Sequence, residues 1–136
     1  MKGQERWDVH PLKPGDHIRV KYQNFYHHGL YEGEGMVIHF AGPDMRQLLE
    51  PEVVQVRRDS LDTFSMDRHI EVRCYSLRER LQRRPVEKIL SAARERLGEK
   101  GYDILYNNCE HFVNRCVFGK AFSSQIDEMR KMIPAD

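Results

Sequence analysis

Alternating apolar and polar residues predict strands in the first half of the chain. From residue 17 to 22, Ile18, Val20 and Tyr22 alternate with polar neighbours, after a turn at Pro14-Gly15-Asp16. Similar patterns predict strands over residues 25–31, 36–41, 53–56 and 69–74, and one helical turn over 60–64. These segments are short and closely spaced in sequence, which favours an antiparallel sheet.

Helical periodicity follows in the second half. Residues 86–97 place Ile89, Leu90, Ala93 and Leu97 on one face, with Pro85 in the first turn and Gly98 as the stop. A second apolar stripe predicts a helix from Cys109 to Gly119, and a short helix is predicted over 123–132. We therefore expect one α+β domain over residues 1–136, an antiparallel sheet packed against helices, with a core of about 12–120 and a short helical tail over 121–136.

Composition narrows the functional classes. Of the 136 residues, 32% are charged, and the net charge of +1 gives no indication of an acidic tail or a general nucleic-acid binder. Cys74, Cys109 and Cys116 are odd in number and irregularly spaced, so we predict free thiols in a reducing compartment. The sequence shows no signal peptide and no apolar run of membrane-spanning length, which predicts a cytoplasmic protein whose membrane contact, if any, is peripheral. The arginines between 78 and 84 are interpreted as a solvated surface, with a phosphate-facing rim as the alternative.

The cysteine helix carries the first candidate site residue. Asn107 or Asn108 can cap this helix, which places Cys109 in its first turn on the apolar side. The positive end of the helix dipole favours thiolate there, as a nucleophile requires. A buried structural thiol is the alternative interpretation of the same pattern.

A histidine-rich hairpin supplies the second candidate group, His27, His28 and His39. A three-residue loop, Gly33-Glu34-Gly35, would pair Gly29 with His39 and leave His27 on the same face. A two-residue turn at Gly33-Glu34 would pair His28 with His39 instead. The residues alone do not choose between these registers. In the first register, the absent side chain at Gly29 leaves room for a substrate or for the imidazoles.

Two imidazoles beside a thiol are suited to nucleophilic catalysis. One would take and return the thiol proton, and the other would fix the tautomer of the first. Zinc is the main chemical competitor, but Cys109 and His111 point in different directions on a helix and no Cys-x-x-Cys pair exists. We therefore expect no metal and no cofactor.

The segment His27-His28-Gly29-Leu30-Tyr31-Glu32-Gly33-Glu34-Gly35-Met36-Val37-Ile38-His39, with the later Asn108-Cys109-Glu110-His111-Phe112-Val113, resembles the lecithin:retinol acyltransferase family. The resemblance covers about residues 12–120. It implies a circularly permuted papain-like fold of the NlpC/P60 superfamily, with the catalytic cysteine at a helix N-terminus. It also implies that Cys109 is the nucleophile, His27 the general base and acid, and His39 the orienting third member. Asn108, Glu110 and Gly29 become supporting positions, and His28 stands where an aromatic residue is common.

The same resemblance implies an activity. Such a protein would cleave a phospholipid ester through a thioester acyl-enzyme and pass the acyl group to water, an amine or an alcohol. The expected partner is therefore a phospholipid or another acyl ester, with no nucleic acid. Two alternatives stay open: a cysteine amidase or peptidase of the wider superfamily, and a binding module that keeps the fold without turnover.

Overall fold

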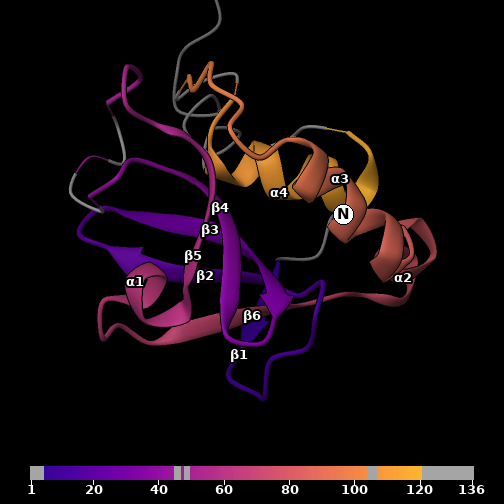
Figure 1. The fold of residues 1–136 in the computed structure, drawn as a ribbon. Helices are drawn as coiled ribbons and strands as arrows, with labels where there is room; N and C mark the ends of the chain where they lie inside the picture. The colour runs from indigo at the N-terminus through magenta and orange to yellow at the C-terminus, as the bar shows by residue number, and fades with distance from the viewer. Residues whose placement is uncertain (1–4, 45–46, 48–49, 104–106, 121–136) are drawn as a thin grey trace, which may run out of the picture.

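A six-stranded antiparallel sheet is the centre of the molecule, with strand order β1-β6-β2-β3-β4-β5 (Figure 1). The computed structural model describes residues 5–44, 47, 50–103 and 107–120. The strands are β1 (Arg6–Asp8), β2 (His17–Tyr22), β3 (Phe25–Gly33), β4 (Met36–Ala41), β5 (Gln55–Ser60) and β6 (Ile70–Cys74). The helices are α1 (Leu61–Ser65), α2 (Leu77–Gln82), α3 (Val86–Glu95) and α4 (Cys109–Phe118). The α+β class predicted from the sequence is confirmed.

The two faces of the sheet are covered differently. Helices α3 and α4 lie over one face, where side chains of β3, β4 and β5 bury a continuous apolar core against them (Figure 1). The other face holds a smaller cluster around Phe64 of α1, which is fully buried. Strand residues alternate between the two cores: Leu30 and Ile38 face α4, whereas Val37 faces Phe64.

Several predicted elements shift in the structure. Strand β5 begins at Gln55 and continues to Ser60, beyond the predicted range of 53–56. The arginine-bearing stretch after Cys74 contains a helix, α2, which a Ser76–Glu79 capping box starts. Strand β1, at the sheet edge, was not predicted. The predicted helix over 123–132 lies outside the described residues. Within the described ranges, no helix has the length and apolar character needed to cross a bilayer.

The hairpin of β3 and β4 settles the register that the sequence left open. Gly29 pairs with His39, as the three-residue loop predicts. The turn itself differs, because Gly33 pairs with Met36 around Glu34 and Gly35, whose positive φ values of 53° and 75° are typical of a two-residue type I′ turn. A bulge between Tyr31 and Gly33 inserts the extra residue, so the register reaches the predicted pairing.

Candidate active site

Cys109 is the first residue of α4, and Asn108 caps the helix. The Asn108 side chain accepts a hydrogen bond from the backbone N–H of His111 at 2.9 Å. In return, Nδ1 of His111 accepts from the backbone N–H of Asn108 at 3.0 Å. This reciprocal cap occupies His111 and fixes the first turn of α4, in which Cys109 is 5% exposed.

The Cys109 thiol meets the backbone of β3. The main-chain N–H of His28 donates a hydrogen bond to it, just beyond the point where the β3–β4 ladder ends at Gly29 and His39. Strand amides lie in the plane of the sheet, so this hydrogen bond brings the thiol to the backbone of β3 at the residue that follows His27.

The charge state of this thiol differs from the sequence prediction. Burial raises the pKa of Cys109 to about 12, and the Glu110 carboxylate adds to this increase. The amides of His28, Glu110 and Cys109 lower the pKa in part, but burial dominates. The expected thiolate at the helix N-terminus is therefore wrong for the resting protein, which holds a neutral thiol.

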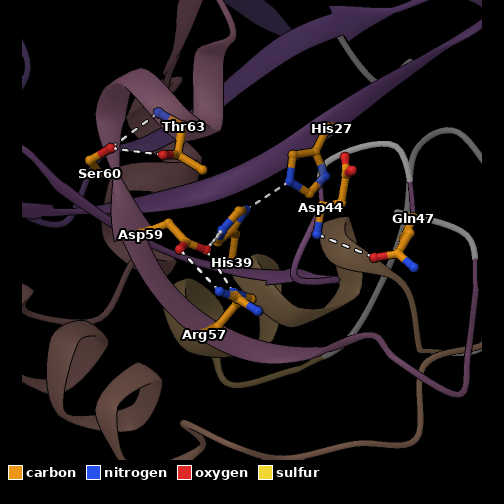
Figure 2. Close-up of polar contacts among 8 residues, drawn as sticks. All are labelled: His27, His39, Asp44, Gln47, Arg57, Asp59, Ser60 and Thr63. Carbon is orange, nitrogen blue, oxygen red and sulfur yellow. Dashed lines mark hydrogen bonds and ion pairs between the residues drawn. The ribbon is translucent and has the colours of Figure 1, made fainter.

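His27 and His39 form a buried pair on the face away from α4. Nε2 of His27 lies 2.9 Å from Nδ1 of His39, and the two side chains are 1% and 0% exposed (Figure 2). Phe64 packs against both rings, with centroid distances of 5.2 and 5.5 Å. Burial is the first cause of the lowered pKa of each imidazole, so both are neutral at pH 7.

An acidic residue that the sequence analysis missed continues this pair. Oδ2 of Asp59 lies 2.8 Å from Nε2 of His39 and also accepts from Nε of Arg57 at 2.8 Å (Figure 2). Hydrogen bonds from His39 and Arg57 outweigh burial and lower the pKa of Asp59, which is therefore ionised. Ending the predicted strand at residue 56 hid this contact, since only a longer β5 brings Asp59 to the face that carries His39.

His28 faces the opposite way, toward α4. Its Nδ1 lies 2.7 Å from Nε2 of His17, and its Nε2 lies 4.0 Å from Glu110 of α4. Trp7 packs edge-on against both imidazole rings. Burial lowers the pKa of His28 to about 3. His28 and His17 are therefore core residues beneath α4, separated by the sheet from His27 and His39. In the described ranges, no group of three His, Cys, Asp or Glu side chains is arranged to hold a metal ion.

Gly29 leaves no space for a substrate. A Cβ atom there would lie 2.6 Å from Cε1 of Phe64 and 2.8 Å from Cγ1 of Val37. The expected room beside the imidazoles is thus filled by the Phe64 ring, and Gly29 supports the site by letting that ring reach both histidines.

Comparisons of the sequence with known proteins show which family it matches. The family model for lecithin retinol acyltransferase matches residues 10–122. Phospholipase A and acyltransferase 4 of Homo sapiens is 34% identical over 131 residues, which cover 87% of this chain and 77% of the human protein. Phospholipase A and acyltransferase 3 of Homo sapiens is 30% identical, with 86% and 77% covered.

Lecithin retinol acyltransferase of Rattus norvegicus is 26% identical over 149 residues, which cover 93% of this chain and 63% of the rat protein. The chain thus spans about three quarters of the phospholipase relatives and less than two thirds of the rat acyltransferase. The family model covers most of the chain and includes all three histidines of the hairpin and the start of α4. The chain therefore belongs to the lecithin retinol acyltransferase family.

Proposed function

We propose that the protein is a thiol-dependent acyltransferase or phospholipase A that cleaves a phospholipid ester through an acyl-enzyme. The observation that supports the proposal is the hydrogen bond from the backbone N–H of His28 to the Cys109 thiol, because His28 directly follows His27, which pairs with His39. The relatives named phospholipase A and acyltransferase support the same chemistry.

In this proposal Cys109 attacks as a thiol that loses its proton during the reaction. The sulfur forms a bond to the ester carbonyl carbon while the proton passes to His27. His27 then protonates the departing alkoxide as the carbon–oxygen bond breaks, which leaves a thioester on Cys109. Water, an amine or an alcohol attacks this thioester in the second half, with His27 taking the proton of the acceptor and returning one to the sulfur.

Helix α4 would contribute electrostatic stabilisation in the same steps. The backbone N–H groups of Cys109 and Glu110 act on the thiol, because both lower its pKa. These donors stand at the capped start of the helix, where the first N–H groups point out of the helix end. We therefore propose that they also hold the oxyanion that forms on the substrate carbonyl.

The broader setting follows from the same proposal. We propose that residues 1–136 form one domain with a permuted papain-like topology, working without a cofactor. A cytoplasmic location and peripheral contact with a membrane remain predictions from the sequence.

The proposal is tested by turnover of a short-chain phosphatidylcholine. We expect Cys109→Ala and His27→Ala each to reduce fatty-acid release and acyl transfer to a primary amine by at least about 1000-fold, with unchanged circular dichroism. His69→Gln, an exposed histidine, is the matched control and should keep wild-type rates. Full activity in either active-site variant, or amine release from peptides with inert phospholipids, would contradict the lipid-directed enzyme.

A further inference from the structure

We infer that Asp59 is a fourth member of the site, a positioning residue that holds His39 and, through it, fixes which nitrogen of His27 takes the thiol proton. This inference rests on the proposed function and deepens it. Asp59 does not touch the reacting atoms. It acts at the end of an unbroken chain that runs from Arg57 through Asp59 and His39 to His27 (Figure 2).

The direction of every hydrogen bond in this series follows from the carboxylate of Asp59. Asp59 carries a carboxylate that accepts from Arg57 at 2.8 and 3.3 Å, so it has only acceptor capacity to offer. Nε2 of His39, 2.8 Å away, must then carry a hydrogen. A neutral imidazole has one protonated nitrogen, which leaves Nδ1 of His39 as an acceptor.

The same logic passes to the next ring. Nε2 of His27 lies 2.9 Å from the accepting Nδ1 of His39 and must donate. Its second nitrogen, Nδ1, is then unprotonated and free to receive the proton of Cys109. If these hydrogen bonds ran in the opposite direction, Nδ1 of His27 would already hold a hydrogen and could not act as the base.

Asp59 also stabilises the charged state that forms during the reaction. When His27 becomes an imidazolium, its N–H donates to His39, and the negative charge of Asp59 lies one ring further on. Both rings are buried, so little solvent screens this interaction. Arg57 holds the carboxylate of Asp59 in place from the more exposed side, with its own side chain 27% exposed.

Another acidic residue among the described residues forms a comparable ion pair that does not include a histidine of the site. Glu32 of β3 also accepts from two arginines, Arg58 and Arg94, but it does not bond to a histidine of the site. Glu32 is therefore a matched control: Glu32→Gln removes a comparable ion pair and leaves the imidazole chain intact.

Tautomers can be read directly from ¹⁵N-histidine two-bond correlation spectra at pH 7.5, without any substrate. In the wild type we expect hydrogen on Nε2 of both His27 and His39. In Asp59→Ala we expect a mixture that includes Nδ1–H forms of both rings, while Glu32→Gln keeps the wild-type signature. Wild-type tautomers in Asp59→Ala would overturn the inference.

Kinetics provide the second readout. We expect Asp59→Ala to lower kcat on phosphatidylcholine roughly 10- to 100-fold with little change in KM, and to slow iodoacetamide alkylation of Cys109 in proportion. Asp59→Asn, whose carbonyl can still accept from His39, should keep the tautomers but lose about 10-fold in alkylation rate because the charge is gone. Asp59→Asn serves as the test if Asp59→Ala does not fold. An unchanged alkylation rate of Cys109 in Asp59→Asn would overturn the role of the charge.

Failure of the proposed function gives a different result. If the wild type shows no phospholipid turnover, the spectra and the alkylation rates still measure what Asp59 does to the histidines and to Cys109. Changed tautomers with no lipid turnover would keep the positioning role and reject the substrate. Unchanged tautomers with normal lipid turnover in Asp59→Ala would reject the role and keep the enzyme.

Discussion

At the scale of single residues, the site depends on which way each side chain of β3 points. His27 and His28 are neighbours, yet one joins His39 beside Phe64 and the other joins His17 beneath α4. A strand forces this separation, because successive side chains leave opposite faces. Gly29, the next residue, has no side chain where the Phe64 ring passes. The His27–His39 pair therefore packs against Phe64 because Gly29, two residues after His27, has no side chain to block the ring.

Gly29→Ala tests this packing. The added methyl group would lie 2.6 Å from the Phe64 ring, so we expect a loss of about 1–3 kcal/mol in the free energy of unfolding, measured in urea. Phe64→Leu should also destabilise on its own, by opening a cavity. The double variant should lose less than the sum of the two, since the smaller side chain makes room for the methyl group. Simple additivity would show that Phe64 is not what excludes a side chain at residue 29.

At the scale of elements, the strands and helices that carry the site were largely predictable. Periodicity placed β2, β3, β4, α3 and α4 within a few residues, and the glycine-bearing turn allowed the pairing of Gly29 with His39. The hairpin loop was wrong in detail because a bulge is invisible to simple counting.

Other parts of the site could not be predicted, for physical reasons. Residues 55–60 of β5 are mostly polar, so no apolar alternation marked Asp59 as part of a strand. The pKa of Cys109 was predicted in the wrong direction because a local dipole argument does not include the burial that tertiary packing imposes. Both failures concern contacts between segments distant in sequence, which local patterns do not encode.

At the scale of the whole molecule, the lowered pKa values of four buried histidines make stability depend on pH. The pKa of each of these imidazoles is lowered, first by burial, and the four are His17, His27, His28 and His39. In the unfolded chain these histidines bind protons near pH 6.5. In the folded protein they bind protons only at lower pH, and the pKa of His28 is about 3. Protons therefore favour unfolding, so the stabilising effect of neutral burial is present above pH 6.5 and is lost as the pH falls.

We expect the urea midpoint to be constant between pH 8 and 7 and to fall steadily below pH 6.5. Each histidine contributes up to about 1.4 kcal/mol per pH unit in the window between its two pKa values. An equal midpoint at pH 6.5 and 5.5 would show that the folded protein accepts these protons.

The most direct test of the proposed chemistry is the intact mass of the protein after brief incubation with a short-chain phosphatidylcholine. We predict an added acyl mass on the wild type that hydroxylamine removes, and no addition on Cys109→Ala. The same acyl mass on both proteins would contradict a thioester on Cys109. So would a wild type that gains no acyl mass and releases fatty acid at the same rate as Cys109→Ala.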